Sequence, residues 1–516
     1  MAHGDFHRGL QHNSQIQRSE FAQRGVFGRM FPTLDVQEFD DALLERLAAK
    51  MRDNSGGEDN ATIPAGYTFL GQFIDHDMTF DPTSSLERQN DPEAIYNFRT
   101  PLLELDSVYG SGPGVSPHLY DQSEFGKLLI GQDSAGAPES DLPRNLQGTA
   151  IIGDPRNDEN LIVSQLHLAF LKFHNRVLAK LKADVPSLAD PQDRFREAQR
   201  IVRWHYQWLI VEEFLPRILS KDTYGQIFKK DSQNNIVEVN IEFLHFYNDP
   251  FIPIEFAVAA YRFGHSMVRP GYSVNQNFSV PLFGAPNAPS LNPRTIQNAA
   301  NISGAGVSAT LLNPLWSIDW SRFFELGPQH TKVGANLPQT QVVDASTILP
   351  GGQITVSVPQ LSKKIDSKLS GSLFSLPGAD PNDIRASLAF RNLKRGAVFS
   401  LPWGQNVADA ILKNPSQKLT KAQLDLTDSN GPIQFPADRV PLWYYILREA
   451  EVKGKGKHLG PVGGRIVGEV FAALLLHDPK SYLAQQPGWQ PNENVPIRLT
   501  TANTFTVGDF LNFASS

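Results

Sequence analysis

Residues 154–177 read DPRNDENLIVSQLHLAFLKFHNRV, and this stretch predicts a long helix. Asp154 and Pro155 form a strong helix start, because an acidic N-cap accepts from backbone N–H groups and proline fits the first turn. Apolar side chains then recur at helical spacing from Leu161 to about Leu181. The stretch therefore favours a protein built on long, partly buried helices.

The same spacing predicts further helices, whereas strand-like alternation is scarce. The predicted helices cover residues 37–50, 67–80, 191–220, 254–268, 383–392, 404–413, 440–452 and 463–476. Residues 354–361 (ITVSVPQL) form the best short strand pattern, and residues 84–150 and 280–380 read as irregular. The predicted fold class is mainly α, with long loops and little β structure.

The composition of the chain excludes several classes of function. The chain has 516 residues and a formal net charge of −7, so it has no basic excess to attract nucleic acid or an anionic membrane. The absence of cysteine excludes disulfides, zinc thiolates, iron–sulfur clusters and thiolate-ligated haem. The sequence contains no apolar run long enough to predict a membrane span, and its N-terminal stretch lacks the apolar core of a signal peptide. We expect a cytoplasmic location, or export without a signal peptide.

The stretch Gly71–Asp77 (GQFIDHD) is the first motif that carries chemistry. On a helix, Gln72 and His76 lie one turn apart on the same face, with Asp75 beside them. A histidine flanked by an amide and a carboxylate could act as a general base. Taken alone, a histidine in an aromatic-rich helix is more often a packed core residue.

Two further motifs each have a functional and a structural interpretation. Arg156 lies in the first turn of the predicted long helix, where a cation opposes the helix dipole, and Glu159 shares its face. A surface ion pair is the structural alternative. In the stretch YRFGHSMV, Arg262 lies one turn before His265, and Gly264 would let a flat group approach. A histidine packed in the core is the alternative here.

Taken together and in this order, the motifs resemble those of the animal-type haem peroxidases. This superfamily includes myeloperoxidase, lactoperoxidase and the cyclooxygenases, and the chain is most similar to its compact bacterial branch. The likeness spans about residues 20–480 and includes LGPVGGRIV at 459–467. It implies a flexible arm over residues 1–20 and one helical haem domain over 21–516, because the two haem-facing histidines lie far apart in sequence.

The resemblance assigns roles to three residues on the distal side of the haem. His76 would take a proton from hydrogen peroxide and return it to the departing oxygen. Gln72 would hold water, peroxide or a halide above the iron. Arg156 would stabilise the charge that develops on the leaving oxygen, which explains an arginine where the helix dipole disfavours one.

On the proximal side, the resemblance makes His265 the ligand of the haem iron. Asn392, in the stretch FRNLKR, would accept from the other ring nitrogen and so orient the imidazole. Arg262 would lie near a haem propionate, where a charge-assisted pair is expected.

The resemblance also implies covalent attachment of haem b. Asp75 and Glu159 match two carboxylates that form ester bonds to haem methyl groups in mammalian enzymes. The methionine that forms a sulfonium link in myeloperoxidase is replaced by Asn160, so that link cannot form here.

A calcium ion is the second cofactor that the resemblance implies. Its ligands would be Asp77 and the oxygens of Thr100, Leu102, Glu104 and Asp106, and a site rich in carboxylates and other oxygens suits Ca²⁺. The family usually has aspartate in place of Glu104 and serine in place of Asp106. The alternative is an acidic loop that binds no metal.

The expected function is a haem peroxidase that reduces hydrogen peroxide and oxidises small organic donors, with iodide, bromide and thiocyanate as further candidate donors. A fatty-acid dioxygenase of the same superfamily is the first alternative. Such enzymes need a tyrosine three residues before the proximal histidine, where this chain has Arg262; Tyr261 lies four before. The second alternative, an inactive haem-binding or adhesive module, is disfavoured by the retention of Gln72, His76 and Arg156.

Overall fold

The structure is a computed structural model, and it confirms the predicted mainly α class. It describes residues 27–36, 40–79, 100–133, 135–246, 249–276, 278–283, 317–326, 339–344, 353–376, 379–491 and 505–515. In these ranges helices predominate and every sheet has two strands. The predicted arm over residues 1–20 lies outside the described residues, and its division from the rest of the chain stays a prediction.

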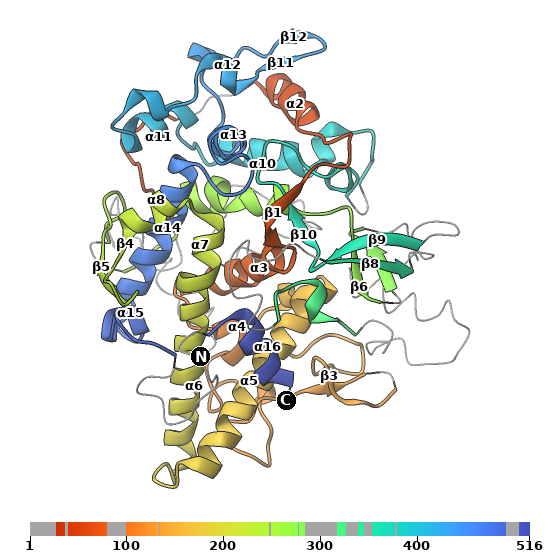
Figure 1. The fold of residues 1–516 in the computed structure, drawn as a ribbon, viewed down its shortest axis with the longest axis vertical. Coiled ribbons are helices and arrows are strands. Elements are labelled where there is room, and N and C mark those ends of the chain that lie inside the picture. The colour runs from red at the N-terminus through yellow and green to blue at the C-terminus, as the bar shows by residue number, and fades with distance from the viewer. Residues whose placement is uncertain are drawn as a thin grey trace, which may run out of the picture.

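Helices are the main secondary structure of the described chain (Figure 1). The α-helices are α2 (Asp41–Lys50), α3 (Gly66–Met78), α4 (Asp106–Tyr109), α5 (Leu161–Asp184), α6 (Pro191–Trp208), α7 (Leu215–Ile218), α8 (Lys221–Ile227), α10 (Leu388–Val398), α11 (Gly404–Ile411), α12 (Lys421–Leu424), α13 (Leu442–Lys453), α14 (Pro461–His477), α15 (Tyr482–Gln485) and α16 (Val507–Ser515). The π-helical segments are η3 (Leu209–Phe214) and η4 (Glu255–Ala259). The 3₁₀ segments include η2 (Pro155–Asp158), η5 (Ala260–Met267) and η11 (Ile384–Ala386).

The strands form antiparallel pairs. These are β1 (Asp59–Pro64) with β10 (Leu361–Lys363), β2 (Gly131–Gln132) with β3 (Pro138–Asp141), β4 (Phe228–Lys230) with β5 (Ile236–Val239), β6 (Gly271–Asn275) with β7 (Phe278–Pro281), β8 (Gln339–Asp344) with β9 (Gln353–Val358), and β11 (Thr427–Asp428) with β12 (Gly431–Pro432). The strand predicted at 354–361 is confirmed as β9 up to Val358, whereas Leu361 begins β10; the pairing of β9 with β8 was not predicted.

The predicted helix from Asp154 is wrong at its start. Asp154 caps only the short segment η2, where its side chain accepts from the N–H of Arg156. The long helix α5 begins at Leu161, because the side chain of Asn160 accepts from the N–H of Val163 and forms a second cap. Arg156 therefore lies on a separate turn before the helix.

Two other predicted helices also differ from the structure. The helix predicted over 254–268 is divided into η4 and η5, with non-helical backbone at Ala259 (φ −128°, ψ −71°). The helix predicted over 383–392 begins at Leu388, because Ser387 caps α10. Asp383 caps the short segment η11 instead.

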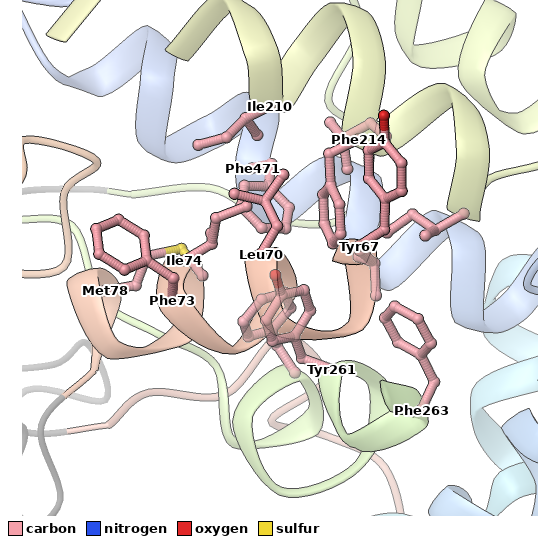
Figure 2. Close-up of a cluster of buried hydrophobic side chains, with 14 of the residues drawn as sticks. Tyr67, Leu70, Phe73, Ile74, Met78, Ile210, Phe214, Tyr261, Phe263 and Phe471 are labelled. Carbon is pink, nitrogen blue, oxygen red and sulfur yellow. The ribbon is translucent and has the colours of Figure 1, made fainter. Parts of the chain in front are cut away.

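Helix α3, which carries the first motif, lies among packed aromatic elements. Figure 2 shows it between η3 and α14 on one side, with Phe214 and Phe471, and η5 on the other, with Tyr261. On α3, Phe73 stacks on Phe170 of α5 at a centroid distance of 4.7 Å. The helix begins at Gly66, where an added Cβ would lie only 2.5 Å from the carbonyl oxygen of Phe323. These contacts fix the direction in which α3 presents its polar face.

A search of the described helices for a membrane-crossing segment found none that is both long and apolar enough.

A buried carboxylate couples the stability of the fold to pH. Glu449 of α13 accepts from the N–H groups of Val462 (2.9 Å) and Gly463 (3.3 Å) at the start of α14. Burial raises the pKa of Glu449 to about 8. Because the folded state therefore holds the proton more tightly than the unfolded state, Glu449 makes stability fall as pH rises from about 4.5 to 8.

We expect Glu449→Gln to melt at a higher temperature than the wild type at pH 8, since the neutral amide keeps an acceptor for both N–H groups. The gain should be roughly 2–4 kcal/mol in free energy of unfolding, at about 1.4 kcal/mol per unit of pKa shift. At pH 5, where the wild-type carboxyl is already protonated, the two proteins should melt together. Equal melting temperatures at pH 8 would show that the carboxyl is not held in its neutral form.

Candidate active site

His76 lies near the C-terminal end of α3 and is buried. Its Nδ1 is 2.8 Å from Oδ1 of Asn157, which belongs to η2. Because an amide oxygen can only accept, Nδ1 of His76 donates and Nε2 keeps its lone pair. The ring is thus oriented with a proton acceptor at Nε2, as a general base requires.

Arg156, the second residue predicted on the distal side, lies next to His76. Its Nη2 donates to the carbonyl oxygen of His76 (3.1 Å) and to the carbonyl oxygen of Thr79. The same atom pairs with the fully buried carboxylate of Asp154 at 2.7 Å. The cation therefore lies at the carbonyl end of α3, where the helix dipole favours it, and not at the N-terminus of α5.

Gln72 lies one turn before His76 on α3 and is half-buried. Its Oε1 accepts from Nδ2 of Asn160 at 3.1 Å. Asn160 is itself held by its role as the cap of α5. The amide of Gln72 is thus oriented so that its NH₂ group can donate to a ligand.

The predicted proximal motif lies on η5, and Asn392 of α10 contacts it, but through its NH₂ group and not through the oxygen that was expected to accept from His265. Nδ2 of Asn392 is 2.8 Å from Nδ1 of His265, and Oδ1 of Asn392 accepts from Nη1 of Arg262 at 3.0 Å. Burial and the positive charge of Arg262 lower the pKa of His265 to about 3. The imidazole is therefore neutral, which is the form that binds a metal ion.

The distal and proximal motifs meet although they are far apart in sequence. The hydroxyl of Tyr261 on η5 donates to the carbonyl oxygen of Gly71 on α3 at 3.2 Å. The carboxyl of Asp75 interacts with a charged residue from each motif. Burial raises its pKa, while the positive charges of Arg156 and Arg262 act to lower it. The two arginines therefore lie close enough to act on one carboxylate.

The residues of this site fit a haem. An added Cβ at Gly264 would meet no atom within 4 Å, so there is open space beside the backbone next to His265. That space adjoins a neutral imidazole held by Asn392 and the cation Arg262. Donors of these types are the ones that a ferric haem with anionic propionates requires.

The carboxylates that were predicted to form ester bonds to haem or to bind calcium differ in their burial. Glu159, predicted to form an ester, is exposed, whereas Asp75 is half-buried. Asp77, predicted to bind calcium, is fully buried, and it accepts from the N–H of Leu105 (3.1 Å) and the hydroxyl of Ser107 (3.4 Å).

No group of three or more His, Cys, Asp or Glu residues in the described ranges is arranged to hold a metal ion. Burial and the charge of Asp106 both raise the pKa of Glu104, which opposes ionisation of the Glu104 carboxyl in the absence of a cation. The calcium site stays a prediction, and no step below depends on it.

Three residues that contact His76 or Arg156, directly or through a neighbour, had no predicted functional role. The prediction for Asp154 was a helix cap alone, yet its carboxylate also holds the side chain of Arg156. Asn157 and His167 are the other two. Nδ2 of Asn157 is 2.9 Å from Nδ1 of His167. The position of Asn157 next to Arg156 was the one sequence signal that could have indicated it.

Comparison with known families identifies one match. Residues 84–299 match the family described as animal haem peroxidase. The matched segment contains Arg156 and His265, whereas His76 and Asn392 lie outside it.

Individual proteins are similar over parts of the chain. Mouse (Mus musculus) thyroid peroxidase is 28% identical over 195 residues, which are 35% of this chain and 20% of that protein. Peroxidasin of Drosophila melanogaster is 26% identical over 214 residues, covering 41% of this chain and 13% of that protein. The chain thus spans a fifth or less of the length of these relatives.

Solved structures share the fold over most of the chain. Peroxidase A from Dictyostelium discoideum has a TM-score of 0.56 at 14% identity, with 91% of each chain covered. A fatty acid alpha-dioxygenase of Arabidopsis thaliana has a TM-score of 0.55 at 15% identity, covering 94% of this chain and 82% of that one. At this identity the likeness concerns the fold alone.

Proposed function

We propose, from the match of residues 84–299 to the animal haem peroxidase family, that the chain reduces hydrogen peroxide and oxidises small organic donors. The observation that carries the proposal is that the structure joins two half-sites. The first contains the predicted distal residues His76 and Arg156, and the second contains the predicted proximal residues His265 and Asn392. On one side, Nη2 of Arg156 donates to the carbonyl oxygen of His76. On the other, His265 is kept neutral by burial and the charge of Arg262, and its Nδ1 contacts Asn392.

In this proposal, His265 would hold haem, and the haem iron would supply the redox chemistry that cleaves the O–O bond of peroxide. Nε2 of His76 would take a proton from peroxide and deliver it to the departing oxygen, which would leave as water. Arg156 stabilises the negative charge on that oxygen. Because Asp154 and two backbone carbonyls fix the guanidinium, it needs little reorganisation during the reaction.

The proximal hydrogen bonds imply a rearrangement when haem binds. Coordination through Nε2 of His265 requires that its proton sit on Nδ1, and Nδ1–H needs an acceptor. In the structure the oxygen of Asn392 accepts from Arg262, and its NH₂ group faces Nδ1. We expect the amide to turn once Arg262 pairs with a haem propionate, so that its oxygen accepts from Nδ1.

The proposal extends to the finer features of the family. Asp75, close to the charges of both arginines, and Glu159 would form the ester bonds to haem. Gln72 would donate to peroxide or to a halide, because Asn160 already engages its oxygen. Iodide, bromide and thiocyanate are the halide-type donors that we propose.

The test is a paired assay of the haem-loaded protein. We expect peroxide-dependent oxidation of guaiacol, and of iodide or bromide, without oxygen uptake in the presence of oleic acid. The reason is that Arg262 occupies the position of the radical tyrosine of the dioxygenases, while Tyr261 bonds to a backbone carbonyl. Oxygen uptake with oleic acid would favour a dioxygenase, and a haem complex without any turnover would indicate a binding module.

A further inference from the structure

Asn157 lies between two buried histidines of the distal side. Its Oδ1 is 2.8 Å from Nδ1 of His76 on α3, and its Nδ2 is 2.9 Å from Nδ1 of His167 on α5. Asn157 and His167 are fully buried, and His76 nearly so. A single side chain therefore connects the two rings, within a site otherwise described by His76, Arg156 and Gln72.

The chemistry of the amide gives the two rings opposite roles. The oxygen of Asn157 can only accept, so His76 must donate from Nδ1. The NH₂ group can only donate, so His167 must accept at Nδ1 and, as a neutral ring, carry its proton on Nε2. A half-turn of the amide would reverse both roles together. The tautomers of the two histidines are thus coupled through Asn157.

We propose that Asn157 and His167 are positioning residues that hold His76 in the tautomer with its proton on Nδ1. This inference rests on the proposed peroxidase function, in which Nε2 of His76 must be ready to take a proton. His167 acts through Asn157, because an acceptor at Nδ1 of His167 pairs with the NH₂ group of Asn157 and leaves the amide oxygen facing His76. The reverse orientation would place a proton on Nε2 of His76 and remove the base.

The backbone around Asn157 makes the arrangement rigid. The preceding residue, Arg156, donates to the carbonyl oxygen of His76, so η2 holds both the backbone and the ring of this histidine. The N–H of Asn157 donates to the carbonyl oxygen of Asp154 at 3.1 Å. On the other side, the ring of His167 packs edge-on against Phe73 of α3, at 6.1 Å between centroids.

The first experiment measures the tautomers directly in the haem-free protein. Nitrogen-15 labelling of histidine and long-range proton–nitrogen spectra report which ring nitrogen carries the proton, and the His76→Gln and His167→Gln variants identify the two signals. We expect His76 protonated on Nδ1 and His167 on Nε2. Asn157→Asp should keep the Nδ1 proton of His76, because a carboxylate also accepts. A wild-type His76 protonated on Nε2 would overturn the proposal.

The second experiment measures the rate constant for the reaction of the haem-loaded protein with hydrogen peroxide. Asn157→Leu and His167→Phe should lower it about 10- to 100-fold, part of the range that acid–base catalysis supplies. His167→Gln should stay within about threefold of the wild type, because the amide oxygen of glutamine can accept from Asn157 in place of the ring. Comparing His167→Phe with His167→Gln distinguishes loss of the hydrogen-bond acceptor from loss of the histidine ring itself.

His174 provides the matched control. It lies on α5 like His167, is fully buried, and bonds to the hydroxyl of Tyr109 (3.0 Å) and the carbonyl of Gly126 (2.9 Å). His174→Gln should leave the peroxide rate constant unchanged even if it lowers the melting temperature. An equal fall in His167→Phe and His174→Gln would reduce the role of His167 to packing and contradict the proposal.

The two experiments separate this inference from the proposed function. If the wild-type protein binds haem but does not react with peroxide, the proposed function fails, while the tautomer spectra still decide the coupling. If the wild type reacts and Asn157→Leu and His167→Phe keep its rate constant, the positioning role is refuted and the peroxidase function stands.

Discussion

Replacing His76 with glutamine should lower the rate constant of the haem-loaded protein for hydrogen peroxide by about 10²- to 10⁴-fold, the range that general acid–base catalysis contributes. Glutamine fills similar space and can hydrogen-bond, but it cannot take a proton at neutral pH. The visible spectrum of the resting protein should be retained, because His76 is not the proposed iron ligand. Stopped-flow spectra over a range of peroxide concentrations give the rate constant.

The control for this variant is His245→Gln, which changes an exposed histidine. It should react with peroxide at the wild-type rate. A His76→Gln protein that keeps its haem spectrum and reacts as fast as the wild type would exclude His76 as the base. Arg156 would then be the remaining distal group able to promote cleavage of the O–O bond.

Replacing His265 with phenylalanine should abolish stable haem binding. The imidazole is the proposed iron ligand, and phenylalanine supplies no donor atom to replace it. After incubation with haem and gel filtration, the variant should show no Soret band at the protein peak, whereas His76→Gln should show the wild-type band. Absorption at the Soret wavelength relative to protein absorption is the measurement.

The Asn392→Leu variant distinguishes the contribution of the residue that orients His265 from that of the proposed ligand His265 itself. This variant removes the contacts with Nδ1 of His265 and with Arg262, so we expect haem to bind more weakly but still measurably. Residues that orient a metal-binding histidine typically contribute 10- to 100-fold in affinity. Wild-type haem affinity in His265→Phe would contradict the assignment of the proximal ligand.

The sequence was sufficient for the fold class and for pairs of site residues that are close along the chain. Helical spacing placed Gln72 and His76 on one face of α3, and resemblance linked His76 to Arg156, a contact that spans 80 positions of the chain. Helical spacing alone could not have produced that link, because it carries no information about contacts between helices.

Other features could not be predicted from local sequence patterns, because they depend on contacts between different elements. Asp154 and Asn160 are both good helix caps, and only the folded structure shows that α5 begins after the second one. The coupling of His76 to His167 through Asn157 needs three segments to meet in the core. The contact between Tyr261 and Gly71 is likewise a product of packing. In each case the decisive partner lies on a different element.

The most direct test of the central claim is the visible spectrum of the protein during addition of haem and then of one equivalent of hydrogen peroxide. The account predicts a Soret band that forms with haem, shifts on addition of peroxide, and returns when a phenol is added. The absence of a Soret band despite supplied haem would contradict the assignment of His265 and the joining of the two half-sites.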